Sequence, residues 1–202
     1  GGLADCVTCY TVDPKFTKKE RLKARLKGKP LPKAIFTIDY FVNMAKELEA
    51  MGADMITLKD MAGLIPPMKA GQIIKAYKKN VKIPIDFHTH CTPGYGLASG
   101  ITAILNGVDI LDTAIMNFAG GPAAPSFELI QIICNKLGIE TGINLDAVVR
   151  INKILKEIRL EMADIDSYKI YPIDFDITKD KLPAHIDKYF DDAIAYAKAD
   201  DE

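Results

Sequence analysis

Two histidines form the pair of side chains in this sequence best suited to metal chemistry. His88 and His90 lie two residues apart in the apolar stretch 83–92, IPIDFHTHCT. Successive side chains of a strand point to opposite faces, so Asp86, His88 and His90 are expected on one face. Converging imidazole nitrogens are typical ligands of zinc and related divalent ions. The spacing therefore predicts a ligand pair, and a hydrogen-bonded structural role is the alternative for either ring.

Lys59 is the second residue with unusual chemistry. It ends the apolar stretch 55–58, MITL, where burial of an ammonium group without a partner would be costly. Asp60 is the nearest acid in the sequence, but adjacent strand residues face apart. A desolvated lysine has a lowered pKa and can serve as a base, a Schiff-base former or a carbamate. Lys59 and the histidine pair are thus both expected where a strand ends, which is where parallel α/β folds place their chemistry.

Alternating helices and strands are expected to position these groups. Hydrophobic periodicity and turn residues predict strands at 3–11, 55–59, 81–90 and 108–114. The same patterns predict helices at 37–51, 68–80, 96–105, 126–137, 144–162 and 184–198. Strands that are separated by helices pair in parallel through right-handed crossovers. The predicted fold class is therefore α/β with four βα units.

Composition describes an ordinary globular chain of 202 residues, with 49% hydrophobic residues and a net charge of −1. The sequence contains no apolar run long enough to span a membrane, and its N-terminus lacks the charged and then apolar pattern of a signal peptide. A cytoplasmic protein is therefore expected. The overall charge favours neither nucleic acid nor a membrane surface as a partner. The opening Gly1-Gly2-Leu3 lacks an initiator Met, so either a fragment of a longer chain or an unusual engineered start is expected.

A basic segment and an acidic stretch break this even composition. Residues 15–33 hold nine basic residues and the single acid Glu20, and 16–26 is expected to form a short cationic helix. The segment is either a solvated surface insertion or a docking surface for an anionic partner or phosphate-bearing substrate. Residues 174–202 are mostly acidic, and the third histidine, His185, is expected at the surface there.

The cysteines favour neither a disulfide framework nor a metal site. Cys6 and Cys9 resemble a CxxC motif, but residues three apart on a strand face apart and cannot easily bind one ion. Cys91 and Cys134 lie far away in the sequence. All four are expected to be reduced thiols.

Three stretches carry a family resemblance, namely TLKDMAGLIPP, IDFHTHCTPG and VDILDTAIMNFAGGPAAPS. Together they resemble the carboxyltransferase domain of biotin-dependent pyruvate carboxylases, oxaloacetate decarboxylase alpha subunits and the transcarboxylase 5S subunit, which are TIM barrels. The resemblance covers about residues 3–162. It implies that Lys59 is carbamylated and, with His88 and His90, binds a divalent zinc, manganese or cobalt ion. Carbamylation would convert an unwelcome cation into an anionic oxygen ligand.

The resemblance also implies an organisation and further site residues. Only strands five to eight of the barrel are expected, with residues 1–140 as its C-terminal half, 15–33 as a basic insertion and 141–202 as a post-barrel helical extension. Thr92 and Asn117 are candidate catalytic residues, and Tyr10 is a candidate for binding the biotin cofactor.

Two departures from the family pattern concern the site. The remaining metal ligand of the family, an Asp after the first strand, has no counterpart here, and the carrier segment with its Met-Lys-Met motif is also missing. Pro122 stands where many members have a Thr that shuttles a proton, and proline has no hydroxyl group.

The predicted function is that of a metal-dependent carboxyltransferase subunit. It would move a carboxyl group between biotin on a separate carrier protein and a keto acid or acyl-CoA of the pyruvate and oxaloacetate type, with the metal as a Lewis acid. A chain that supplies the first half of the barrel, or a homo-oligomer, is expected to cover the open sheet. The alternatives are a biotin-independent aldol-type lyase and a non-catalytic half-barrel that serves in assembly.

Overall fold

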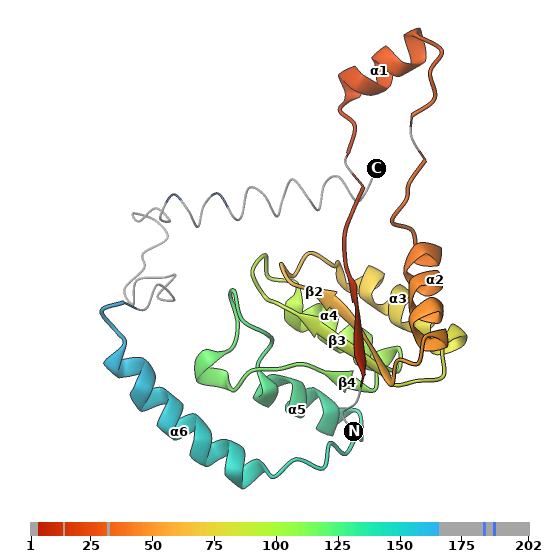
Figure 1. The fold of residues 1–202 in the computed structure, drawn as a ribbon. Helices are drawn as coiled ribbons and strands as arrows, with labels where there is room; N and C mark the ends of the chain where they lie inside the picture. Colours follow the sequence, from red (N-terminus) through yellow and green to blue (C-terminus); the bar gives the residue numbers. More distant parts are fainter. Residues whose placement is uncertain (1–3, 14, 32, 166–183, 185–187, 189–202) are drawn as a thin grey trace.

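The computed structural model describes residues 4–13, 15–31, 33–165, 184 and 188 of the chain (Figure 1). Helices and strands alternate from α2 to β4, as the sequence predicts. The elements are β1 (Asp5–Cys9), α1 (Lys18–Leu26), α2 (Ile38–Ala50), β2 (Met55–Asp60), α3 (Pro67–Asn80), β3 (Ile85–Thr89), α4 (Gly96–Leu105), β4 (Ile110–Leu111), the 3-10 helix η1 (Met116–Phe118), α5 (Phe127–Lys136) and α6 (Leu145–Glu161).

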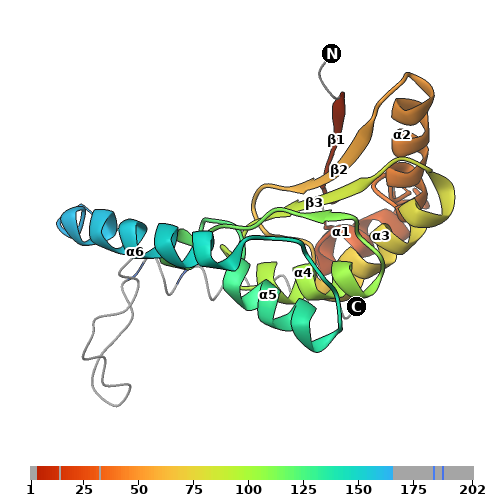
Figure 2. The same ribbon diagram turned by 90° about the horizontal axis from the view of Figure 1, so that it is seen from below.

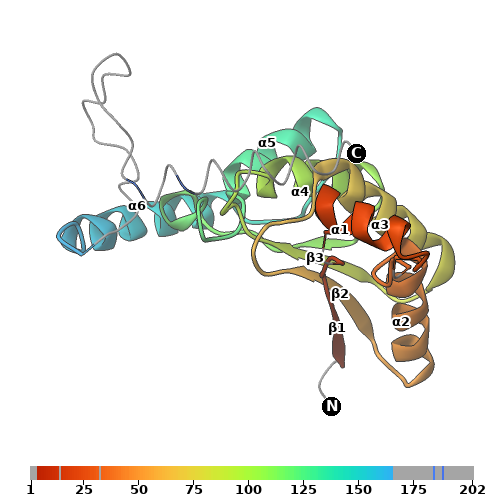
Figure 3. The same cartoon turned by 90° about the horizontal axis from the view of Figure 1, so that it is seen from above.

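The four strands form one parallel sheet in the order β1-β2-β3-β4. Helices α2, α3 and α4 lie on one face of this sheet, and no described helix lies over the other (Figures 2 and 3). β1 and β4 are the two edges of the described sheet. The predicted α/β class with four parallel strands is therefore confirmed, and the sheet has the open face expected of a partial barrel.

The core lies between the sheet and its helices. Phe87 of β3 and Leu58 of β2 are fully buried against Phe41 of α2 and the α3 helix. The Tyr77 hydroxyl of α3 lies 2.8 Å from the Thr8 hydroxyl of β1, which satisfies both polar groups inside the apolar layer. Alternate residues of each strand, including Lys59 and His88, consequently point to the open face.

Three strands are shorter than the sequence predicts, and β1 spans only Asp5–Cys9 of the predicted 3–11. β4 spans only Ile110–Leu111, because the chain turns away after it and Ala114 pairs with Ser126 instead. β3 ends at Thr89, because the Cys91 amide donates to Ala123 in the loop after η1 rather than to a neighbouring strand. His90 therefore lies just beyond the strand, where the alternation of side chains does not fix its direction. Of the predicted helix at 184–198, the structure describes only Ala184 and Lys188, both helical, and the predicted surface position of His185 lies outside the described residues.

Two helices stand away from the sheet. The predicted cationic helix is α1, at the tip of an arm formed by residues 11–37 between β1 and α2 (Figure 1). Helix α6 follows α5 and contacts η1, where the Asn117 side chain donates to the Asn152 carbonyl and side-chain oxygens. Among the described residues, no helix is both long enough and apolar enough to cross a membrane.

Candidate metal centre

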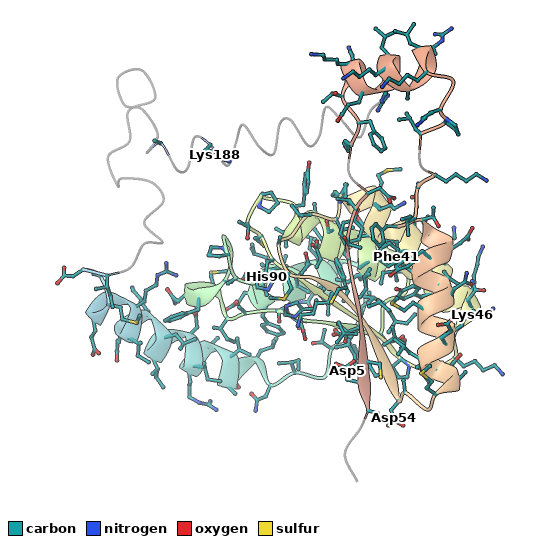
Figure 4. All side chains as sticks on the ribbon, turned by 45° about the horizontal axis from the view of Figure 1, so that its top comes forward. Asp5, Phe41, Lys46, Asp54, His90 and Lys188 are labelled. Carbon is teal, nitrogen blue, oxygen red and sulfur yellow. The ribbon has the colours of Figure 1, made fainter. Side chains whose placement is uncertain are left out.

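The predicted site residues meet at the carboxyl ends of β2 and β3. Cys9, Lys59 and His88 are neighbours in the register of β1, β2 and β3, so their side chains project side by side from the open face. His90 follows β3 and lies near the middle of the molecule in Figure 4. The structure thus brings Lys59 and the histidine pair to one edge of the sheet, as the sequence predicts.

The Nε2 atoms of the two imidazole rings face each other. Nε2 of His88 lies 3.0 Å from Nε2 of His90, and the ring centroids are 5.0 Å apart. Two nitrogen ligands at about 2.1 Å from one metal ion, at right angles, would lie about 3.0 Å from each other. The rings therefore have the separation of two ligands of a single ion.

The other ring nitrogens have acceptors that fix the tautomers. His88 Nδ1 lies 2.7 Å from Oδ2 of Asp112, and His90 Nδ1 lies 2.5 Å from the carbonyl oxygen of Pro122. An ionised carboxylate and a carbonyl can only accept, so each Nδ1 carries the hydrogen. In the neutral rings both Nε2 atoms then present lone pairs to each other. Such a pair requires either a shared proton or a bound cation.

The remaining ligands of a metal ion come only partly from the described residues. These residues contain no cluster of three or more His, Cys, Asp or Glu side chains that could hold a metal ion. Lys59 is half-buried rather than buried, and its amine forms no hydrogen bond or ion pair with a described residue. The burial cost inferred from the sequence is therefore smaller than expected. The donor set fits a divalent ion if Lys59 supplies an oxygen as a carbamate.

The Lys59 loop is joined to the histidine loop through Asp60. The Asp60 carboxylate accepts hydrogen bonds from the amides of Leu64 and Ile65, at 2.9 and 2.8 Å, and from the Thr89 hydroxyl. Burial raises the pKa of Asp60, and these hydrogen bonds oppose that rise. The Asp60 carboxylate therefore binds the loop after Lys59 and the Thr89 hydroxyl. It is not the partner of the Lys59 amine.

Gly63 makes a second connection between the two loops. Its φ angle is +67°, and a Cβ atom there would lie 2.1 Å from the carbonyl oxygen of His90. Only glycine permits both this backbone conformation and this approach. The close packing holds the backbone of His90 against the loop that follows Lys59.

A buried carboxyl group lies beneath the histidine pair. Asp86 shares the open face with His88, is 5% exposed, and has an Oδ1 atom that makes no hydrogen bond to a described residue. The Thr57 hydroxyl lies 2.9 Å from both Asp86 and Asp5, although it can donate only one hydrogen. The pKa of Asp86 is raised to about 6, chiefly by burial and also by the charges of Asp112 and Asp5, against the opposing Thr57 hydrogen bond.

The three weaker site predictions lie around this cluster without joining it. Thr92 is exposed in the loop after β3. Asn117 is tied to α6 through Asn152, as described above. The Tyr10 ring stacks on Phe41 at a centroid distance of 5.7 Å, on the helix side of the sheet and away from Lys59. The predicted catalytic roles of Thr92 and Asn117, and the predicted cofactor role of Tyr10, remain predictions.

The partners of the two histidines were not identified from the sequence. Asp112 is an acid near the carboxyl end of the predicted strand 108–114, and that position could have marked it as a candidate. The Pro122 carbonyl has no signal in the sequence, because any residue supplies a backbone carbonyl. In the sequence, Pro122 is unusual only because it lacks the hydroxyl group of the Thr that many family members have at this position.

The fold and the site together define a class of protein, a parallel β/α fold with a candidate metal centre at the carboxyl ends of its strands. The HMGL-like family model matches residues 32–155, more than half of the chain, and the chain belongs to that family. The chain is 39% identical over 151 residues to a pyruvate carboxylase subunit of Methanocaldococcus jannaschii, an alignment that covers 75% of this chain and 22% of that protein.

Two further relatives support the same relationship. The chain is 32% identical over 185 residues to the methylmalonyl-CoA carboxyltransferase 5S subunit of Propionibacterium freudenreichii subsp. shermanii, covering 91% of this chain and 32% of that subunit. It superimposes on the carboxyl transferase domain of Rhizobium etli pyruvate carboxylase with oxalate at a TM-score of 0.62 and 32% identity, covering 78% of this chain and 24% of that one. The resemblance stated from the three motifs is confirmed, and the fold matches part of a TIM-barrel carboxyltransferase domain. The chain spans well under half the length of these relatives.

Proposed function

We propose that this chain supplies metal-binding residues of a biotin-dependent carboxyltransferase of the pyruvate and oxaloacetate type. The observation that carries the proposal is the 3.0 Å approach of the two Nε2 atoms, with both Nδ1 atoms engaged elsewhere. The names of its relatives, pyruvate carboxylase and methylmalonyl-CoA carboxyltransferase, supply the reaction class. His88, His90 and a carbamylated Lys59 would hold a divalent zinc, manganese or cobalt ion.

Each residue has a defined chemical task in this proposal. The neutral amine of Lys59 would attack carbon dioxide, so that an N–C bond forms as one C–O π bond opens, and release of an N–H proton to water would leave an anionic carbamate. Asp112 and the Pro122 carbonyl orient the two imidazoles and favour the tautomers whose Nε2 atoms accept a cation. Once bound, the metal would supply Lewis-acid polarisation of the keto acid. Asp60 and Gly63 hold the two ligand loops at a fixed separation.

The open face of the sheet needs a covering partner, and the proposed reaction needs a carrier protein and a substrate. Val7 of β1 and Ile110 of β4 are 40% and 41% exposed, although both lie on strands. A second polypeptide segment, from another chain or another copy, would cover this face and supply the ligand that the described residues lack. Biotin would arrive on a separate carrier protein, and a small keto acid would bind beside the metal.

The proposal is tested by metal content and affinity. Purified protein is expected to bind Co²⁺ or Zn²⁺, and Lys59→Ala, His88→Ala and His90→Ala are each expected to weaken that binding at least tenfold. Lys82→Ala, an exposed lysine just before β3, is the matched control and should bind as the wild type does. Full metal occupancy in all three site variants would contradict the proposed centre.

A biotin-independent aldol-type lyase is the second candidate. It is favoured by one observation: the position aligned with the family Thr is Pro122, whose carbonyl is already used by His90. Oxaloacetate decarboxylation measured with and without biocytin separates the two. A rate that depends on biocytin supports the carboxyltransferase, an equal rate without it supports the lyase, and a folded chain with neither metal nor activity supports a non-catalytic role in assembly.

A further inference from the structure

The arm formed by residues 11–37 is a charged feature that the proposed site does not use. Within it, residues 15–33 hold nine basic residues and one acid, a formal charge of +8, in a chain whose net charge is −1. The rest of the chain therefore carries −9. The cations are thus concentrated on one projection rather than spread over the surface.

The arm is a preformed element. Helix α1 begins at a capping box in which the Thr17 side chain accepts from the Glu20 amide, and Glu20 accepts from the Thr17 amide at 2.8 Å. Its two legs are joined at the base by Asp13, whose carboxylate accepts from the amides of Ile35 and Phe36 at 3.0 Å. α1 therefore keeps its shape without packing on the sheet, and it buries none of its own residues.

The cations of helix α1 are available for binding. Glu20, the only acid of residues 15–33, is occupied by the capping box. Within the described residues, no salt bridge engages the cations of α1, which are Lys18, Lys19, Arg21, Lys23 and Arg25. Leu22 and Leu26 are 57% and 78% exposed beside them. An acidic protein surface with some apolar area would match both features.

The arm begins at the same end of the sheet as the candidate metal centre. Its first leg continues directly from Cys9, the register neighbour of Lys59, and the Tyr10 amide donates to the Lys59 carbonyl at 2.7 Å. Figure 4 shows α1 projecting on the side of the molecule opposite to Asp5 and Asp54, which mark the amino ends of the strands. A protein held by the arm would lie beside the entrance to the centre.

We propose that the arm is the docking surface for an acidic face of the biotin carrier protein. This inference rests on the proposed function, which requires biotin on a carrier to reach Lys59 and the histidine pair from this end. Docking would hold the carrier close to the site and speed its association through charge attraction. A membrane is disfavoured because α1 has nine residues and only two large apolar side chains, too few for an interfacial helix.

The test uses the full chain and a quadruple variant, Lys18→Gln, Lys19→Gln, Lys23→Gln and Arg25→Gln. This variant keeps the capping box, so α1 should remain folded. The control carries the same charge change on exposed lysines of α2, α3 and the turn before β3, as Lys46→Gln, Lys75→Gln, Lys79→Gln and Lys82→Gln. The probe is a biotinylated carrier domain with an acidic surface, and its dissociation constant is measured by calorimetry at low and high salt without added metal.

The arm variant is expected to bind the carrier at least about tenfold more weakly at low salt, while the control stays within about twofold of wild type. Added salt should weaken the wild type and largely remove the difference. Equal carrier binding by wild type and arm variant would overturn the inference. It would also be overturned if the arm substitutions changed only self-association, or only binding to phosphatidylserine vesicles or duplex DNA.

A parallel assay separates this inference from the proposed function. Free biocytin lacks a protein surface, so its reaction with oxaloacetate should be the same in the wild type and the arm variant. If carrier binding depends on the arm but no biocytin reaction occurs, the proposed function is rejected and the docking surface is supported. A biocytin reaction together with arm-independent carrier binding would reject the docking surface alone.

Discussion

Oδ2 of Asp112 lies 2.7 Å from Nδ1 of His88, and this contact fixes which nitrogen of the ring faces His90. Removing the carboxylate charge with Asp112→Asn should loosen the ring and lower its basicity. We expect metal affinity to fall by about 10- to 100-fold. Competition with a chromophoric chelator measures it.

A neighbouring acid provides the control for Asp112. Asp109 pairs with Lys78 at 2.8 Å and does not contact either histidine. Asp109→Asn should therefore lower stability slightly and leave metal affinity unchanged. If the two variants lost the same metal affinity, the effect would be one of general charge rather than of ring orientation.

Gly63 offers a test of the packing that holds His90. In Gly63→Ala the left-handed backbone costs about 1 kcal/mol, and the new Cβ would meet the His90 carbonyl oxygen. We expect an unfolding free energy lower by more than about 2 kcal/mol, together with weaker metal binding. Gly28→Ala is the matched control, because Gly28 has φ +59° but nothing within 4 Å of the added Cβ. For Gly28→Ala, urea unfolding should show a loss of unfolding free energy equal to the cost of the left-handed backbone alone.

Asp86 should make the metal-free protein less stable as the pH rises. Its folded pKa of about 6 lies above the ordinary 3.8, so the folded state holds a proton that the unfolded state has lost between these values. The unfolding free energy should therefore fall from about pH 4 to pH 6. Asp86→Asn removes this dependence and should be more stable by about 3 kcal/mol at pH 8.

The Asp86 difference should vanish below about pH 4, where the wild-type carboxyl is protonated in both states. Urea unfolding across this range with chelator present measures it. Asp39→Asn, at an exposed position in the first turn of α2, serves as the comparison. A constant difference between Asp86→Asn and wild type at every pH would contradict the assignment.

The cysteines should differ sharply in reactivity. Burial raises the pKa of the Cys134 thiol, which is 4% exposed, whereas Cys9 is exposed on the open face of the sheet. Because the thiolate is the nucleophile, iodoacetamide at pH 7.5 should modify Cys9 at least about tenfold faster than Cys134. Peptide mass spectrometry follows both sites in one sample. Equal rates would show that Cys9 is covered in solution.

Local patterns predicted most of the elements. The three- and four-residue spacing of Phe41 and Ala45, with Thr37 before them, predicted α2, and the Thr37 side chain is its N-cap. The alternation in 83–92 placed Asp86 and His88 on one face, as observed. β4 was predicted too long because pairing of Ala114 with Ser126 is a tertiary contact, which the apolar residues of 108–114 do not reveal.

The sequence alone determined the residue types of the candidate centre and the strand ends that carry them, because alternation in β3 and the register of parallel strands follow from local chain geometry. Only the tertiary structure decided how those residues are held. His90 leaves the strand, the Pro122 carbonyl turns its ring toward His88, and Asp60 binds the neighbouring loop rather than Lys59. These contacts join residues up to 32 positions apart in the sequence. Whether such residues meet depends on how the loops fold back over the sheet.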